Sequence, residues 1–173
     1  MKRLFLLAGA LLLSLAASAQ RYDFDFTQTR VLKMSGKKTV MTGHITFDGK
    51  DQLAMIYSKP DGDYFIIDGP LVRMDMDGKQ AELNSEKVPL VKLQRATLLN
   101  CLSGNWKQVA EDNNADATVT EKGGFRTVKI VSRKVTTRGG YKSVTLTYRL
   151  KDGLVSRMVL EEAAGIENTY EIQ

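Results

Sequence analysis

Few residues of this chain are suited to conventional catalysis. His44 is the only histidine and Cys101 the only cysteine among 173 residues. The sequence therefore gives little support for a metal site with several His ligands or for a Ser-His pair. His44 falls within an alternating stretch, which favours a structural imidazole over a functional one. Cys101 has the leucine neighbours Leu98, Leu99 and Leu102. This setting is typical of a buried thiol that packs like a small apolar side chain.

The remaining candidate motifs also indicate turns and not sites. Asp75, Asp77 and Gly78 are spaced as in a calcium loop, but the later Glu ligand of such a loop is missing, so a hairpin is the better interpretation. Gly123-Gly124 and Gly139-Gly140 do not open helices and therefore do not indicate phosphate binding. The sequence predicts a protein that is not an enzyme and has no metal site and no cofactor.

Apolar side chains are more abundant than a thin sheet requires. Several predicted strands between residues 53 and 76 are apolar on both faces. Apart from Met1, six methionines lie in or beside predicted strands: Met34, Met41, Met55, Met74, Met76 and Met158. Because methionine is flexible and polarizable, it suits a surface that fits variable apolar partners. An ordinary core in which methionine fills gaps explains the same composition.

Alternation of apolar and polar residues predicts the strands that position these side chains. The predicted strands cover residues 22–26, 40–47, 53–58, 64–67, 71–76 and 80–83, then 117–122, 125–134, 142–150, 154–162 and 166–172. Asp-Gly pairs such as Asp77-Gly78 predict tight turns between them. Between the two sets, leucines at helical spacing predict one amphipathic helix from about Val91 to Trp106, with Gly104 as its stop.

A meander of about ten short strands is expected to curl, because strands twist. We therefore expect a mostly β fold: an antiparallel unclosed β-barrel, or half-barrel, with one internal amphipathic helix as a lid over its apolar face.

The first nineteen residues predict export. Lys2 and Arg3 precede an apolar run from Leu4 to Leu15, and Ala17-Ser18-Ala19 forms a small-residue cleavage site. We expect a signal peptide at 1–19, a single domain at 20–173 and a periplasmic location. The formal net charge is +5, and loss of the signal would leave +3. Because this charge is small and scattered, the sequence gives no indication of nucleic-acid binding.

Several short motifs occur in an order that resembles a known family. They are Phe26–Arg30, Gly43–Phe47, Leu53–Tyr57, Ser58–Pro60 and Ile66–Gly69, followed by the helix that ends near Gly104–Trp106 and the turn at Asp152-Gly153. The set resembles the LolA family, the periplasmic carriers of outer-membrane lipoproteins. The resemblance implies helices lying as a lid across the barrel, and an apolar interior that receives lipoprotein acyl chains. It also implies an inner-membrane release complex, an outer-membrane acceptor and no cofactor.

The chain departs from the family pattern in three places. Only about six residues of the mature chain precede Phe26, where the family has an N-terminal helix. The family has an Arg-Pro pair whose Arg helps hold the lid, whereas this chain reads Asp48–Gln52, so Lys50 is the candidate replacement. The chain stops at Gln173, directly after a strand. A compact relative with altered cargo or regulation would explain all three departures.

The expected function is a periplasmic carrier that binds acyl chains of lipoproteins, or a similar lipid, in an apolar cavity and moves them toward the outer membrane as a monomer. The predicted lining residues are Leu53, Met55, Tyr57, Phe65, Ile67, Val72, Met74, Val144, Leu146, Tyr148, Met158 and Leu160, and the predicted lid residues are Leu98, Leu99 and Leu102. A one-residue slip in register would exchange the lining set for the opposite face.

Two other classes of function stay open. One is a sensor or accessory interaction module of the same fold that binds an envelope protein partner. The other is a hydrolase or lipid-modifying enzyme whose carboxylate pair meets only in space.

Overall fold

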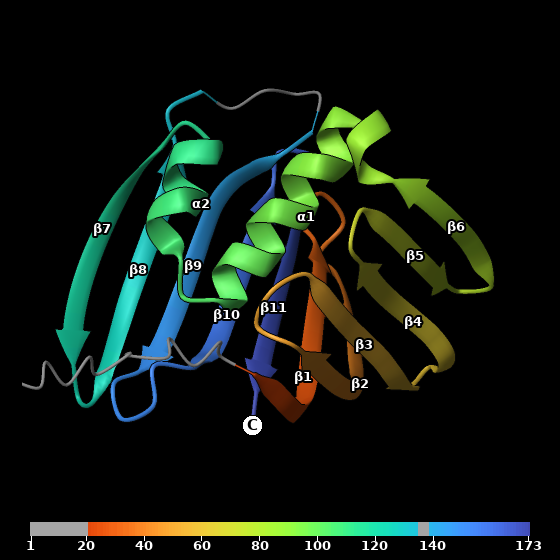
Figure 1. Cartoon of the computed structure of the whole chain (residues 1–173), viewed down its shortest axis with the longest axis horizontal. Helices are drawn as coiled ribbons and strands as arrows, with labels where there is room; N and C mark the ends of the chain where they lie inside the picture. Colours follow the sequence, from red (N-terminus) through yellow and green to blue (C-terminus); the bar gives the residue numbers. More distant parts are fainter. Residues whose placement is uncertain (1–20, 135–138) are drawn as a thin grey trace, which may run out of the picture.

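The part of the chain that the structure describes forms a single curled antiparallel sheet with two helices across one face (Figure 1). The computed structural model describes residues 21–134 and 139–173, so the predicted signal peptide at 1–19 lies outside the described residues. The eleven strands of the described residues are β1 (Tyr22–Leu32), β2 (Lys37–Phe47), β3 (Gln52–Lys59), β4 (Asp61–Asp68), β5 (Leu71–Met76), β6 (Lys79–Asn84), β7 (Ala115–Lys122), β8 (Phe125–Ser132), β9 (Tyr141–Arg149), β10 (Val155–Glu162) and β11 (Ile166–Ile172).

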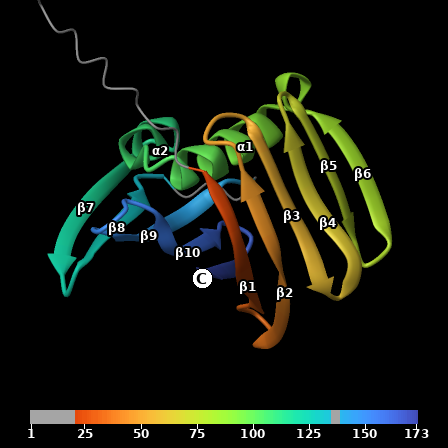
Figure 2. The ribbon, with the colours of Figure 1, turned by 60° about the horizontal axis from the view of Figure 1, so that its bottom comes forward.

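The order of the strands leaves the sheet unclosed. It runs β6-β5-β4-β3-β2-β1-β11-β10-β9-β8-β7, so β6 and β7 are its two edges. The first and last strands pair in the middle, with Phe26 opposite Ile172, and so join the two meanders. Figure 2 shows the sheet curving around the helices while its edges stay apart. The expected antiparallel half-barrel is confirmed.

The cover consists of two α-helices, where the sequence analysis predicted one. A short 3-10 turn (Ser85–Lys87) leads into α1 (Pro89–Leu102), which has proline in its first turn, where a missing N–H is tolerated. The chain turns at Gly104, whose φ is +75°, and α2 (Trp106–Asp112) follows. In α2, Trp106, Val109 and Ala110 face the core at helical spacing, but seven residues are too short a window for a periodic pattern to be recognised. Within the described ranges, no helix is long and apolar enough to cross a membrane.

The turns keep the strands in register. Asp77 and Gly78 both have positive φ, +55° and +71°, as a two-residue hairpin turn requires. The hairpin interpretation of Asp75–Gly78 is therefore confirmed. Gly43 lies beside a β-bulge between β2 and β3, where a Cβ atom would come within 2.3 Å of the Ile56 carbonyl oxygen. Only glycine permits this close approach of the two backbones.

The densest part of the core lies where both helices face strands β8 to β10. Leu102, Val109, Val128 and Leu146 are there with 0% exposure. The Cys101 thiol is fully buried among them, and burial raises the pKa of this thiol far above its ordinary value. Cys101 is thus the inert packing residue that its leucine neighbours predicted.

Candidate functional site

A cavity of about 240 Å³ lies between α1 and the inward face of the sheet. Its walls come from β1, β3 to β5, β9 to β11 and α1. Six of the residues singled out from the sequence line it: Met55, Tyr57, Phe65, Met74 and Leu160 from the lining set, and Leu98 from the lid set. The space beneath the helix is therefore not filled by the side chains of the protein itself.

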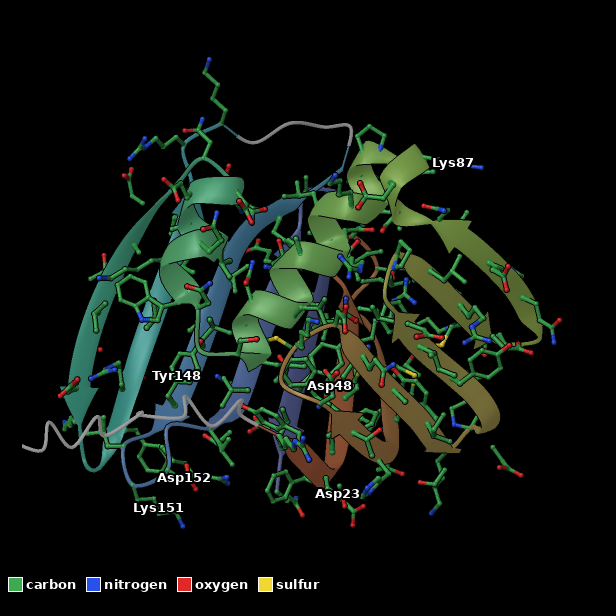
Figure 3. All side chains as sticks on the ribbon, in the orientation of Figure 1. Asp23, Asp48, Lys87, Tyr148, Lys151 and Asp152 are labelled. Carbon is green, nitrogen blue, oxygen red and sulfur yellow. The ribbon has the colours of Figure 1, made fainter. Side chains whose placement is uncertain are left out.

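The other predicted residues share the inward face but do not line this cavity. Leu53, Ile67, Val72, Val144, Leu146 and Met158 are all 3% exposed or less. Tyr148 lies on β9 below the helices (Figure 3), where its hydroxyl donates a hydrogen bond to the Cys101 carbonyl at 3.1 Å. Leu99 and Leu102 are buried in the same core. The register therefore places the whole lining set inward, and the ligand-binding role of these tightly packed members stays a prediction.

A polar chain that the sequence analysis did not identify lines the same cavity. The Tyr57 hydroxyl donates to Gln28 Oε1 at 2.5 Å. Gln28 Nε2 donates to Asn168 Oδ1 at 3.0 Å, and Asn168 Nδ2 donates to Glu162 Oε1 at 3.0 Å. Burial raises the pKa of the Glu162 carboxyl. The sequence did contain a signal for these residues. Gln28 lies two positions from Phe26, and Asn168 two positions from Tyr170, so each shares the inward face of its strand.

Helix α1 is tied to the sheet through a residue other than the predicted one. Arg95 Nε of α1 donates to the carbonyl oxygen of Gly69 in the β4–β5 turn at 2.5 Å. Lys50 is exposed, and its backbone N–H donates to Asp48 Oδ1 at 2.8 Å. Arg95 thus makes a side-chain contact that can restrain the cover, in addition to the Tyr148–Cys101 hydrogen bond, and the lid-holding role of Lys50 stays a prediction.

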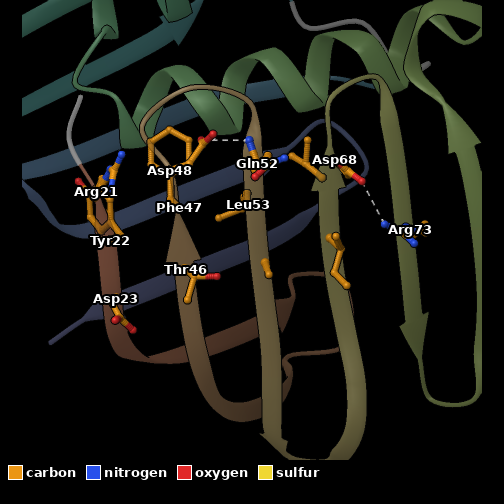
Figure 4. Close-up of a pocket in the computed structure, with 13 residues that line it drawn as sticks. Arg21, Tyr22, Asp23, Thr46, Phe47, Asp48, Gln52, Leu53, Asp68 and Arg73 are labelled. Carbon is orange, nitrogen blue, oxygen red and sulfur yellow. Dashed lines mark hydrogen bonds and ion pairs between the residues drawn. The ribbon is translucent and has the colours of Figure 1, made fainter. Parts of the chain in front are cut away.

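Two larger hollows lie over the strands on the side away from the helices. One, of about 530 Å³, is lined by the outward-facing Thr46, Ala54 and Ile66 and also by the predicted lining residues Leu53 and Ile67 (Figure 4). Arg73 Nη2 and Asp68 Oδ2 pair at its border at 3.4 Å. The other, of about 570 Å³, includes His44 and Ile56. No residue of α1 or α2 lines either hollow, so an acyl chain lying there would keep one side in water. The cavity beneath α1 shields a chain on both sides and is the candidate site, although it is smaller.

His44 forms a polar cluster on the outward face. Its Nε2 hydrogen-bonds Asp23 Oδ1 at 2.6 Å and its Nδ1 hydrogen-bonds Asp25 Oδ1 at 2.9 Å. These two carboxylates, Asp25 first, raise the pKa of His44. Since both ring nitrogens are engaged with carboxylates, this is the satisfied structural imidazole that the sequence favoured. Across residues 21–134 and 139–173, no three His, Cys, Asp or Glu side chains are grouped to hold a metal ion.

Comparison with known proteins gives a family and several distant structures. The family model described as outer membrane lipoprotein carrier protein LolA matches residues 17–173. A LolA superfamily protein from Nitrosomonas europaea is 6% identical, with a TM-score of 0.39 over 90% of this chain and 84% of that one. The MucA/MucB complex of Pseudomonas aeruginosa gives 11% identity and a TM-score of 0.45, over 90% of this chain and 51% of that one. The lipoprotein LppX of Mycobacterium tuberculosis gives 11% identity and a TM-score of 0.32, over 88% of this chain and 85% of that one. A search of curated proteins gives no match.

Proposed function

This chain belongs to the family of the outer membrane lipoprotein carrier protein LolA, and from that premise we propose that it carries acyl chains of lipoproteins, or of a similar lipid, through the periplasm toward the outer membrane. The observation that carries the proposal is the sheltered cavity beneath α1, with Met55, Phe65, Met74 and Leu98 in its wall. A chain bound there is removed from water on the sheet side and on the helix side.

Burial of methylene groups supplies the affinity. Each CH₂ group removed from water contributes about 0.8 kcal/mol, so a long acyl chain binds strongly even if part of it stays exposed. At about 240 Å³ the cavity is smaller than common ligand pockets of about 300–1,000 Å³. Loading therefore requires α1 to move outward, and the Arg95–Gly69 hydrogen bond beside the β4–β5 flank is one contact that must open. The free edges β6 and β7 let the sheet flex without breaking a closed ring of strand pairs.

The rest of the proposal concerns the route and the partners. Residues 1–19 are a cleaved signal peptide, and residues 20–173 work as one periplasmic domain. An inner-membrane release complex delivers the cargo and an outer-membrane acceptor receives it. The carrier acts as a monomer, without catalysis or a cofactor.

A cavity-filling substitution tests the site. In Met74→Trp the larger ring occupies the cavity, and we expect at least a tenfold loss of affinity for a fluorescent palmitoyl probe. Ile56→Trp is the matched control, because Ile56 is 48% exposed and lies on the outward face. Affinity is measured by fluorescence titration of the folded mature protein. Equal affinities for the Met74→Trp and Ile56→Trp variants would contradict the assignment of the cavity.

The native cargo is identified by mass spectrometry of the protein purified gently from the periplasm. We expect lipid or acylated protein bound to the wild type and lost from Met74→Trp. A wild-type protein that is free of both, in several extraction conditions, would contradict transport.

An interaction module of the same fold is the second candidate. The observation that favours it is the edge strand β7, which pairs with β8 on one side only. Every residue of β7 after Ala115 is exposed. Unpaired edge strands can accept a further strand from a partner. An envelope protein partner whose binding persists in lipid-free protein and in Met74→Trp would favour this module over the carrier.

A further inference from the structure

The cavity beneath α1 has two chemically different sides. Met55, Phe65, Met74, Met76 and Leu98 form an apolar side. The opposite side contains Gln28, Arg30, Tyr141, Glu162, Asn168 and Tyr170. A cavity meant only for hydrocarbon gains nothing from buried polar groups, because their desolvation is unfavourable unless each has a partner. The polar side of the cavity therefore needs a separate explanation.

Part of this side is satisfied within the protein. The donations from Tyr57 to Gln28, from Gln28 to Asn168 and from Asn168 to Glu162 all run in one direction. They use both polar atoms of each of the two amide side chains named here. The chain of hydrogen bonds is thus a rigid wall, and its amides are not free to bind a ligand.

Two hydroxyl groups beside this wall are left over. Tyr141 pairs with Glu162 across β9 and β10, and Tyr170 pairs with Gln28 across β11 and β1. Counting only the residues that the structure describes, neither tyrosine hydroxyl has a hydrogen-bond partner, although both line the cavity. Burial, followed by the neighbouring Tyr170, raises the pKa of Tyr141, and burial followed by Glu162 raises the pKa of Tyr170. Both groups therefore stay protonated and available as donors.

The charges at this end nearly cancel. Arg30 is exposed at the mouth of the cavity, and its guanidinium acts electrostatically on Glu162 and Tyr170. Arg30 and Glu162 both line this end of the cavity, so the charge of the guanidinium is opposed by a carboxyl group and a free fatty-acid anion gains little there. Neutral hydroxyl donors in such a setting suit an uncharged acceptor, such as the carbonyl oxygen of an ester or an amide.

We propose that the cavity recognises a single acyl chain by its carbonyl group: the hydrocarbon lies against Met55, Met74 and Leu98, while Tyr141 and Tyr170 donate hydrogen bonds to the ester or amide oxygen. This inference rests on the proposed carrier function and names the part of the lipid that the site reads. The modest volume of about 240 Å³, from which α1 must move outward for loading, favours one chain over several. The same carbonyl chemistry is offered by an N-acylated protein and by a phospholipid ester.

A pair of probes that differ only in the carbonyl tests the inference. The first is palmitoyl lysophosphatidylcholine, and the second is its ether analogue with a hexadecyl chain. Both are used as monomers with the mature full-length protein. We expect the wild type to prefer the ester by about tenfold, the size of effect that two modest hydrogen bonds produce.

Removing the hydroxyls separates recognition from simple burial. In the double variant Tyr141→Phe, Tyr170→Phe the preference for the ester disappears, while affinity for the ether stays within about twofold. Tyr64→Phe is the matched control, since Tyr64 faces outward and does not line the cavity. It retains the wild-type preference.

Each other result has a definite meaning. Equal binding of ester and ether by the wild type, or a preference that survives in the double variant, overturns carbonyl recognition and leaves the carrier proposal standing. Binding of neither probe overturns both. An N-palmitoylated peptide bound more tightly than the lysophospholipid ester identifies acylated protein as the source of the carbonyl, and the reverse order identifies phospholipid.

Discussion

The two flanks of the sheet have the same alternation of inward side chains but different interiors. On the β8–β10 flank, below α1 and α2, Val128, Val144 and Leu146 are at most 1% exposed. On the β4–β5 flank, Ile67 and Val72 are at most 3% exposed, but Phe65 and Met74 beneath α1 are only partly buried and border the cavity. Alternation decides which side chains face inward, whereas the cover decides whether they form a packed core or a cavity. Helix α2 packs on β7 and β8, so the opposite flank is left to α1 alone.

The largest effect we expect contrasts the stabilities of the two flanks. Leu146→Ala leaves a hole in the packed flank and should lower the free energy of unfolding by roughly 2–5 kcal/mol. Met74→Ala, in the wall of an existing cavity, should lower it by about 1–2 kcal/mol. Urea unfolding of both variants measures the difference. Equal losses would show that the two flanks are packed alike and would break the comparison.

The next effect concerns the polar wall between the flanks. Tyr57→Phe keeps the ring, which packs edge-on against Phe26 at a centroid distance of 5.3 Å, but removes the donor to Gln28 Oε1. An unsatisfied buried acceptor should lower the free energy of unfolding by about 1–3 kcal/mol. Tyr64→Phe on the outward face should be neutral. A loss for Tyr57→Phe no larger than that of Tyr64→Phe would argue against a wall held by hydrogen bonds.

Loosening helix α1 should change the rate of ligand dissociation more than it changes the stability of the fold. Arg95→Ala removes the hydrogen bond to Gly69 and should lower the free energy of unfolding by about 0.5–1.5 kcal/mol, while a bound palmitoyl probe dissociates several-fold faster. Stopped-flow fluorescence measures the dissociation rate. Lys92→Ala is the control on the same helix, because Lys92 pairs with Glu86 on the exposed side. Identical dissociation rates in the two variants would show that the Arg95 contact does not restrain α1.

The smallest effect lies on the outward face and should leave both flanks unchanged. The pKa of His44 is raised in the folded state by Asp25 and Asp23. The resulting stability is fully present below the unfolded pKa of about 6.5 and is lost as the pH rises through the higher folded value. Because the His44 side chain is 46% exposed, the contribution should be under about 1 kcal/mol.

An NMR titration of the His44 ring measures this pKa directly. Asp25→Asn should lower it toward the ordinary value without altering the affinity for a palmitoyl probe. A folded-state pKa at or below about 6.5 would contradict the hydrogen-bonded cluster.

Much of the fold could be predicted from the sequence, because strand alternation and turn residues are local signals. The shared face of Val144, Leu146 and Tyr148 followed from that alternation, whereas several strands between residues 53 and 76 are apolar on both faces and left the inward face open. Helix α2 was missed because its apolar residues Trp106, Val109 and Ala110 span only seven positions, too few for a periodic pattern to be recognised. The start of β2 at Lys37 was also missed, since its first residues are exposed and polar and are held by pairing with β1.

The chemistry of the site was harder to predict than its apolar wall. Gln28 and Asn168 are 140 residues apart in the chain, and their contact exists only because the first and last strands pair. The tie from Arg95 to Gly69 likewise joins a helix to a turn that no local pattern connects. The inward parity of polar residues was the available signal, and it would have required assigning β1 and β11 as neighbours.

Covalent mapping of a bound acyl chain tests the central claim most directly. A palmitoyl probe with a diazirine near the end of its chain is bound to the mature protein and activated by light, and the modified residues are located by mass spectrometry. We expect labelling at Met55, Phe65 and Met74, on the loosely covered flank. Labelling concentrated on β8 and β9, or in the outward hollow near Ile66, would contradict a cavity beneath α1 that shelters the chain.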